Sequence, residues 1–143
     1  MFGDVKKIRV LIVDDHAGMR DGIRAVIAAQ PDMEVAGEAG DGEEAVREFG
    51  RVQPDVSLVD FNLPKMSGPE VIVALRAAVP EARCLIITAV NDDGSIRRAF
   101  DAGAMGYLHK DVLRRELLPA IRAVHAGQKY IPADIAMRLK REG

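Results

Sequence analysis

The sequence predicts an α/β protein whose core is a doubly wound parallel sheet with helices on both faces. Short apolar runs rich in β-branched residues alternate with longer segments that carry apolar residues at a spacing of three to four. Two of the runs, IRVLIV at 8–13 and CLIITA at 84–89, are almost continuously apolar, as strands buried on both faces of a sheet are. Parallel neighbours need a crossover, and five strands alternating with five helices provide the crossovers.

The elements follow one another in regular order. Strands are predicted over Ile8–Val13, Met33–Ala36, Val56–Val59, Cys84–Ala89 and Met105–Leu108. The first helix carries Met19, Ile23, Val26 and Ile27 on one face, and the third carries Val71, Ile72 and Leu75 on one face. The other helices are predicted from about Glu43 to Val52, Asp93 to Ala102, and Leu113 to His125. Pro119 falls inside the last helix and predicts either a later start or a kink.

Length and composition limit the kind of protein this is. The chain has 143 residues, 48% hydrophobic and 29% charged, which predicts one globular domain. We expect this domain over residues 1–127 and a tail or linker over 128–143, where Ile135 and Leu139 can share a face of a short extra helix. A single cysteine, Cys84, excludes an internal disulfide and a multi-cysteine zinc site, and favours a core position.

Charge and hydropathy patterns point to the cytoplasm and away from direct nucleic-acid binding. The apolar runs are too short for a membrane helix, and the first residues show no secretory signal. Residues 1–60 carry 13 acidic and 7 basic side chains, which does not suit a nucleic-acid surface. Residues 112–143 carry 7 basic and 3 acidic side chains, most simply a solvated surface.

Polar side chains gather where the buried strands end. Asp14 and Asp15 follow the first strand, Asp60 the third, Thr88 the fourth, and Lys110 the fifth within a few residues. In a doubly wound sheet these ends lie along one edge, where ligands bind. In the flavodoxin-like order 2-1-3-4-5, the first and third strands are neighbours, so three carboxylates would crowd together there.

Such crowding predicts a cation and a phosphorylated ligand. Like charges raise each other's pKa unless a cation compensates, and Mg²⁺ accepts one or two carboxylates, a carbonyl oxygen and waters. Lys110 offers a positive charge to a phosphate oxygen, Thr88 offers a hydroxyl, and an aspartate can be the nucleophile towards phosphorus. This set of residues indicates an aspartyl-phosphate site.

Each of these residues alone has an ordinary interpretation. The acidic pair can cap a helix, Asp60 can begin a turn before Pro64, and Thr88 suits any strand. Lys110 alone is more often solvated, and a tyrosine such as Tyr107 is typically half buried. His16, His109 and His125 lack metal-ligand spacing. Independent turns need not meet at one sheet edge, so the combination favours the site.

Four segments resemble a known family. They are LIVDDH at 11–16, VDFNLPKMSG at 59–68, IITA at 86–89 and GYLHKD at 106–111. Their order, spacing and strand positions resemble the response-regulator receiver domain of bacterial two-component systems over roughly residues 6–127. The GYLHKD segment and the helix-rich tail resemble the NarL/FixJ-type subgroup.

The resemblance implies a role for each residue. Asp60 would be the phosphoacceptor, with Mg²⁺ held directly by Asp15 and by Asp60, through water by Asp14, and by the backbone carbonyl of Asn62. Lys110 would contact the phosphoryl group. Thr88 would swing towards it and Tyr107 would turn inward, switching the loop after the fourth strand.

The resemblance also implies partners. A sensor histidine kinase would supply the phosphoryl group, and we expect a weak, phosphorylation-favoured homodimer. The dimer would form through helix four, strand five and helix five, near Arg97, Arg98, Asp101, Arg114 and Arg115, or through helices one and five. Transcription would be controlled only through a DNA-binding domain absent from this chain, which ends at Gly143.

One residue departs from the family pattern, and other functions stay open. Receivers commonly have proline after the lysine, whereas Asp111 follows Lys110 here, so we expect a trans bond and an altered turn. The leading hypothesis is a signalling switch, not an enzyme beyond self-phosphorylation and autodephosphorylation. The alternatives are a stand-alone phosphorelay or protein-interaction receiver without DNA output, and a phosphatase of the haloacid-dehalogenase type. Such phosphatases usually carry a second aspartate where Asn62 stands.

Overall fold

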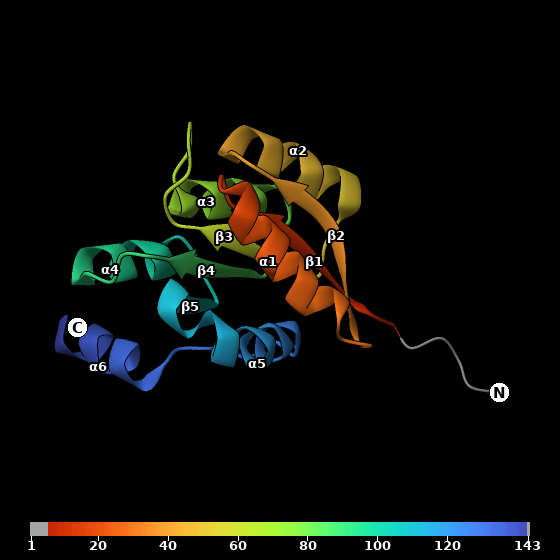
Figure 1. Ribbon diagram of the computed structural model, residues 1–143. Coiled ribbons are helices and arrows are strands. Elements are labelled where there is room, and N and C mark those ends of the chain that lie inside the picture. The colour runs from red at the N-terminus through yellow and green to blue at the C-terminus, as the bar shows by residue number, and fades with distance from the viewer. Residues whose placement is uncertain (1–5, 143) are drawn as a thin grey trace.

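The computed structural model describes residues 6–142 and contains a five-stranded parallel sheet with the order β2-β1-β3-β4-β5 (Figure 1). The strands are β1 Ile8–Val13, β2 Met33–Ala39, β3 Val56–Asp60, β4 Cys84–Thr88 and β5 Gly106–His109. The helices are α1 Ala17–Ala28, α2 Gly42–Val52, α3 Gly68–Ala78, α4 Asp93–Asp101, α5 Leu113–His125 and α6 Ala133–Glu142. The predicted fold class and strand order are confirmed.

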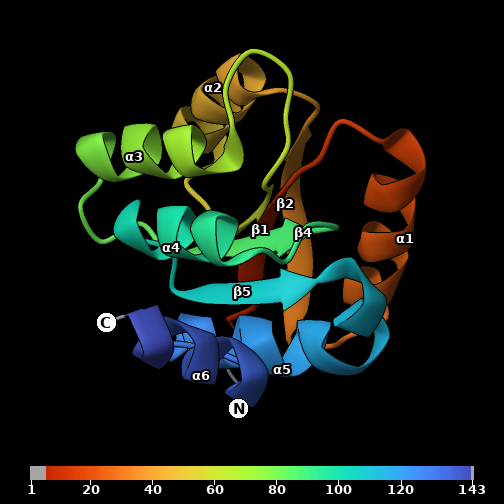
Figure 2. The same cartoon turned by 90° about the vertical axis from the view of Figure 1, so that its left-hand side faces the viewer.

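Two hydrophobic clusters sandwich the sheet. On one face, α1 and α5 pack Ile23, Ile27, Leu117 and Ile121 against β1, β3, β4 and β5. On the other face, α2, α3 and α4 form a second cluster, in which Cys84 of β4 is fully buried. Figure 2 shows α3 and α4 on one side of the sheet and α1 and α5 on the other. Burial raises the pKa of the Cys84 thiol to about 12, as suits a core residue.

Local sequence explains where several helices begin. Asp41, Ser67 and Asp92 are N-caps whose side chains accept a hydrogen bond from the backbone N–H three residues later. Pro69 lies in the first turn of α3, where its missing N–H costs nothing. These caps fix where α2, α3 and α4 leave the carboxyl edge of the sheet.

Four strands have bounds that differ from the prediction, and two of them differ by one residue at the end: β3 ends at Asp60 instead of Val59, and β4 ends at Thr88 instead of Ala89. β2 extends to Ala39 instead of Ala36, because it pairs with β1 along its whole length across an irregularity at Val10/Leu11. β5 begins at Gly106 and ends at His109, one residue later than predicted. α5 runs from Leu113 to His125 as predicted, with Pro119 inside it, so the alternative of a later start is wrong. Its buried face holds the helix on the sheet.

The end of the chain packs against the domain. Tyr130 forms a parallel bridge to Gly106, and α6 contacts α4. The predicted boundary at residue 127 stays a prediction, and residues 1–5 and Gly143 of the predicted segments lie outside the described residues. Among residues 6–142, no helix has the length and apolar character needed to cross a membrane.

Candidate functional site

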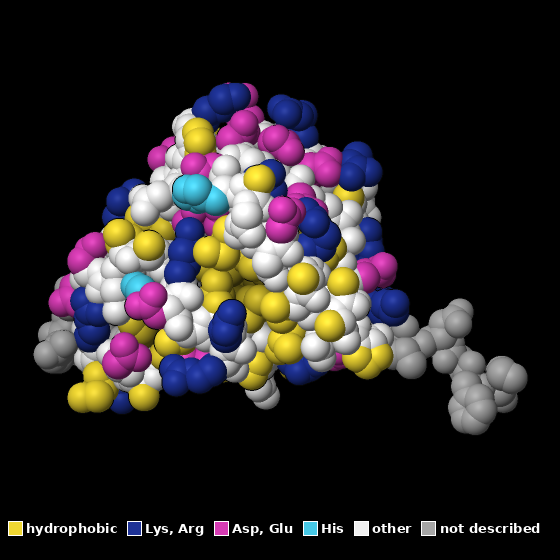
Figure 3. All heavy atoms as spheres, in the orientation of Figure 1, with side chains coloured by type: hydrophobic (Ala, Val, Ile, Leu, Met, Phe, Trp, Pro, Cys, Tyr) yellow, Lys and Arg dark blue, Asp and Glu magenta, His cyan; other side chains and the backbone are white. Residues whose placement is uncertain are grey.

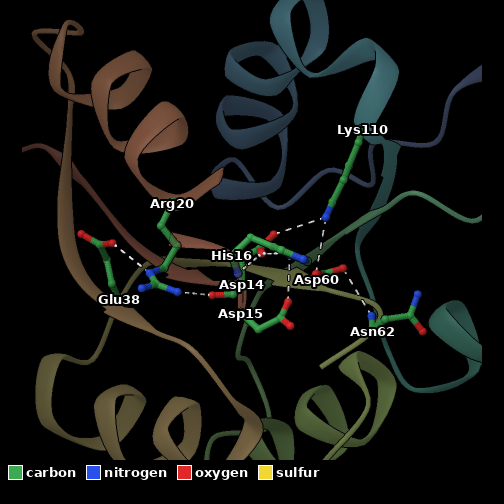
Figure 4. A network of polar contacts seen from close by, with 8 residues as sticks. All are labelled: Asp14, Asp15, His16, Arg20, Glu38, Asp60, Asn62 and Lys110. Atoms are coloured by element: carbon green, nitrogen blue, oxygen red, sulfur yellow. Dashed lines mark hydrogen bonds and ion pairs between the residues drawn. The ribbon is translucent and has the colours of Figure 1, made fainter. Parts of the chain in front are cut away.

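The carboxyl edge of the sheet brings three aspartates and a lysine together. Asp14 and Asp60 are buried, at 2% and 4% exposure, and Asp15 is partly exposed beside them. Lys110 Nζ lies 3.5 Å from Asp14 Oδ2 and 3.5 Å from Asp60 Oδ2. Figure 4 shows the lysine reaching between the two carboxylates. Residues from β1, β3 and the end of β5 therefore meet as predicted, because β3 is the neighbour of β1.

The electrostatics of this cluster are unbalanced. Burial raises the pKa of the Asp60 carboxyl, and the nearby charge of Asp14 raises it further. Lys110 and the backbone N–H of Asn62, which donates to Asp60 Oδ1 over 3.3 Å, act in the opposite direction. Two buried carboxylates share the ammonium of Lys110, and Asp15 adds a third carboxylate to the cluster, so the site favours additional positive charge.

The donor set fits a hard divalent cation. Ligand atoms of Asp14, Asp15, His16 and Asp60 lie within 4.8 Å of one another. Carboxylate oxygens at this spacing are ligands that Mg²⁺ accepts, with room for waters and phosphate oxygens.

His16 belongs to this cluster, although its spacing in the sequence does not predict a metal ligand. Its Nδ1 lies 3.2 Å from Asp14 Oδ1 and 3.1 Å from Asp15 Oδ1, and its backbone N–H donates to Asp14 Oδ1 over 2.8 Å. His16 directly follows Asp14 and Asp15 in the sequence. This adjacency could have predicted its place in the cluster, whereas a search for metal-ligand spacing among the histidines could not.

Arg20 and Glu38 support the loop that carries the acidic pair. Arg20 Nη1 donates to the backbone carbonyl of Asp14 over 2.5 Å, and its Nε lies 3.4 Å from Glu38 Oε1 (Figure 4). Glu38 lies near the end of β2, beyond the strand end predicted at Ala36. The underestimated length of that strand concealed its place at this edge.

A tight backbone contact fixes Asp60 from below. The N–H of Gly68 donates to the carbonyl of Phe61 over 2.7 Å. A Cβ at position 68 would lie 2.5 Å from the backbone oxygen of Asp60 and 2.8 Å from Phe61 Cα. Only glycine permits this approach of α3 to the end of β3.

Thr88 and Tyr107 meet at the loop that follows β4. The Val90 N–H donates to Thr88 Oγ1 over 2.9 Å, and the Tyr107 hydroxyl donates to the Val90 carbonyl over 2.8 Å. Tyr107 is fully buried, beyond the half burial typical of tyrosine, and burial raises the pKa of its hydroxyl to about 12. His109 Nε2 lies 3.1 Å from the Ala89 carbonyl. Residues of β5 thus hold the β4–α4 loop at two points.

The turn after Lys110, where Asp111 stands in place of the family's common proline, is a short helix. Lys110–Val112 form a short 3₁₀ helix in which His109 Nδ1 accepts the N–H of Asp111 over 3.1 Å. The peptide bonds of the described residues, including the one after Lys110, are trans.

Comparison with known proteins agrees with this geometry. Residues 10–122 match the response regulator receiver domain. The chain belongs to that family. The predicted family is therefore confirmed, and this chain is a receiver domain of two-component response regulators.

Several relatives of this receiver are transcriptional regulators. It is 42% identical over 136 residues to the uncharacterized transcriptional regulatory protein YxjL of Bacillus subtilis, covering 95% of this chain and 62% of that protein. It is 37% identical over 132 residues to the DNA-binding transcriptional activator DevR/DosR of Mycobacterium tuberculosis, covering 92% and 61%. The receiver chain spans about three-fifths of the length of these relatives.

A solved structure shares this fold. A LuxR-family two-component response regulator from Aurantimonas superposes with a TM-score of 0.89 at 36% identity, covering 96% of this chain and 98% of that one. This similarity supports the receiver fold over nearly the whole chain.

Proposed function

We propose that Asp60 accepts a phosphoryl group from a phosphohistidine of a sensor histidine kinase. The observation that carries this proposal is the buried Asp60 carboxylate beside Asp14, with Lys110 Nζ 3.5 Å from both. A carboxylate oxygen of Asp60 attacks phosphorus, the bond from phosphorus to the histidine nitrogen breaks, and its electron pair leaves with the imidazole. Autodephosphorylation follows when water replaces Asp60 on the phosphorus.

The surrounding residues prepare this transfer. Asp15 and Asp60 directly, Asp14 through water and the carbonyl of Asn62 would hold Mg²⁺, which neutralises the crowded oxygens when bound. Lys110 contacts a phosphoryl oxygen as a compact positive charge. The raised pKa of Asp60 makes its carboxylate a stronger base than a solvated aspartate, and Lys110 and the Asn62 N–H act in the opposite direction by favouring the ionised form.

The switch follows from the same charges. Thr88 turns from Val90 towards the phosphoryl group. The β4–α4 loop, whose Val90 carbonyl accepts a hydrogen bond from the buried Tyr107 hydroxyl, then rearranges. The conformational change controls an output. Transcription is favoured over a stand-alone phosphorelay, because relatives such as YxjL and DevR/DosR are transcriptional regulators. A DNA-binding segment outside this chain would act on the DNA, in a cytoplasmic protein.

The direct test is incubation with Mg²⁺ and acetyl phosphate followed by intact mass measurement. We expect one added phosphoryl group on the wild type and none on Asp60→Asn. An adduct on Asp60→Asn, or steady turnover of a phosphomonoester by the wild type, would contradict a switch that acts through Asp60. If acetyl phosphate leaves the wild type unmodified, binding of beryllofluoride with Mg²⁺ tests whether the site is intact.

Dimerisation is proposed through one of two surfaces. An apolar hollow of about 480 Å³ lies between α1 and α5, lined by Met19, Ile23, Val26, Leu113 and Leu117 (Figure 3). This hollow gives a second copy access to the surface of α1 and α5. The other surface, built from α4, β5 and α5, is partly covered because α6 lies against α4. Sedimentation of resting and beryllofluoride-loaded protein over a concentration series tests the dimer, and identical behaviour would contradict it.

A further inference from the structure

The tail of the chain is built into the edge of the sheet. The Tyr130 N–H donates to the Met105 carbonyl over 2.8 Å, and the Tyr107 N–H donates to the Tyr130 carbonyl over 3.3 Å. The Tyr130 hydroxyl donates to Glu116 Oε1 over 2.7 Å. A Cβ at Gly106 would lie 2.9 Å from the Tyr130 oxygen, so glycine at this position lets the tail approach. The tail therefore covers the outer edge of β5 (Figures 1 and 2).

α6 then seats itself against α4. Ile135 is 3% exposed within the cluster that α2, α3 and α4 form, and Leu139 packs against the same cluster. Arg138 Nε lies 2.6 Å from Asp93 Oδ1. Asp93 is the first residue of α4, so the ion pair attaches α6 to the end of α4 that leaves the site.

The segment between Thr88 and Asp93 connects the two places. It consists of four residues, Ala89–Asp92, and Thr88 Oγ1 holds its second residue through the Val90 N–H. Asn91 Oδ1 is buried without a hydrogen-bond partner and lines a cavity of about 60 Å³ together with Pro132 and Ile135 of the tail. The loop therefore joins Thr88 at one end to the residues that contact α6 at the other.

We infer that docking of α6 and phosphorylation of Asp60 oppose each other through the β4–α4 loop, an inference that rests on the proposed function. The docked α6 fits the loop arrangement in which Thr88 holds Val90. When Thr88 turns towards a phosphoryl group, it releases Val90, and the four-residue segment transmits the shift to Asp93. This shift weakens the ion pair between Arg138 and Asp93 and the packing of Ile135 against α4, so α6 dissociates from the domain. Coupling between two binding equilibria is reciprocal, so releasing the tail strengthens binding at Asp60.

Two measurements on the full chain test the coupling. The first is deuterium uptake at the amides of residues 129–140, without ligand and with Mg²⁺ plus beryllofluoride; we expect faster uptake in the loaded protein. The second is calorimetric titration of beryllofluoride at saturating Mg²⁺. We expect Arg138→Ala to bind it about fivefold more tightly than wild type. Lys140→Ala, which removes an exposed positive charge from the same helix, should match wild type.

The outcomes separate this inference from the proposed function. If the wild type binds beryllofluoride but Arg138→Ala binds it equally well and tail uptake is unchanged, the coupling is wrong while the acceptor site stands. Slower uptake on loading, or weaker binding by Arg138→Ala, would reverse the sign and also overturn the inference. If the wild type neither binds beryllofluoride nor accepts a phosphoryl group from acetyl phosphate, the proposed function fails and the coupling falls with it.

Discussion

Charged residues are exposed and paired at the amino ends of the strands (the amino edge of the sheet), and buried and crowded at their carboxyl ends (the carboxyl edge). At the amino edge, Arg122 binds Asp32 through two contacts, Nε to Oδ2 over 3.0 Å and Nη2 to Oδ1 over 3.1 Å, and the Arg9 N–H donates to Asp55 over 2.9 Å. The Arg122 and Asp32 side chains are 44% and 39% exposed. At the carboxyl edge, the Asp14 and Asp60 side chains are 3% and 4% exposed and share Lys110.

This difference separates charges that tolerate folding from charges that serve a ligand. Exposed, paired charges lose little hydration and contribute little to stability. Buried like charges are costly unless a cation or a hydrogen bond compensates them. The buried carboxylates at the carboxyl edge therefore destabilise the folded receiver, and a ligand that supplies positive charge stabilises it.

The largest expected effect comes from the backbone contact beneath Asp60. Gly68→Ala would place a Cβ 2.5 Å from the Asp60 oxygen, so the end of β3 or the start of α3 must move. We expect the free energy of unfolding to fall by about 2 kcal/mol. Calorimetry should also show weaker Mg²⁺ binding, because the Asp60 backbone is displaced. Urea unfolding measures the stability.

Gly22→Ala is the matched control. A Cβ at Gly22, in the exposed part of α1, would meet no atom within 4 Å. We expect this variant to be more stable by about 0.5–1 kcal/mol, because alanine restricts the unfolded chain and favours helix. If Gly68→Ala were as stable as Gly22→Ala, the close fit around Asp60 would be refuted.

The next effect concerns the buried charge itself. In the absence of divalent cations, Asp60→Asn should raise the free energy of unfolding by about 1 kcal/mol, because it removes one of two crowded buried carboxylates while Lys110 keeps Asp14. Addition of Mg²⁺ should stabilise the wild type, by about 1.4 kcal/mol at ten times the dissociation constant. The variant should gain less. A variant that is less stable than wild type without Mg²⁺ would show that Lys110 fully compensates Asp60.

Most of the acidic site was predictable, and the reasons are specific. Asp14, Asp15 and Lys110 follow recognisable strands and Asp60 ends one, and parallel strands bring such positions to one edge. Sequence patterns locate residues along the chain, so they suffice when topology alone decides which residues meet.

The supporting residues depend on packing that no local pattern reports. Glu38 was hidden because β2 is less apolar than its neighbours and pairs beyond its predicted end. The seat of α6 depends on Asp93 and Arg138, 45 residues apart, and on a glycine at 106 that admits Tyr130. Pro119 in α5 follows the same rule, since tertiary packing overrides its local preference.

The pH dependence should distinguish the two edges by sign. The pKa of Asp60 is raised in the folded receiver, so this group favours folding below its unfolded pKa and loses that contribution as the pH rises. The pKa of Asp32 is lowered by the Arg122 hydrogen bond, so its contribution is present at neutral pH and lost as the pH falls through its folded pKa.

Urea unfolding of the wild type, Asp60→Asn and Asp32→Asn from pH 7 to 3, without metal, measures both signs. At pH 7 we expect the free energy of unfolding to be higher for Asp60→Asn than for the wild type, and lower for Asp32→Asn. Both differences should shrink as the pH approaches 3, because the wild-type carboxyls protonate. Curves that diverge towards low pH for either variant would contradict the corresponding assignment.

The smallest effect is expected at the amino edge at neutral pH. Asp32→Asn removes the carboxylate that Arg122 binds, but both side chains are substantially exposed, and water replaces the lost contact. We expect a small decrease in melting temperature in low salt that disappears at 1 M salt, because ions screen exposed charges. The Asp60→Asn difference should survive the same salt, since buried charges are screened much less. If salt abolished both differences equally, the two edges would not differ in the way their burial implies.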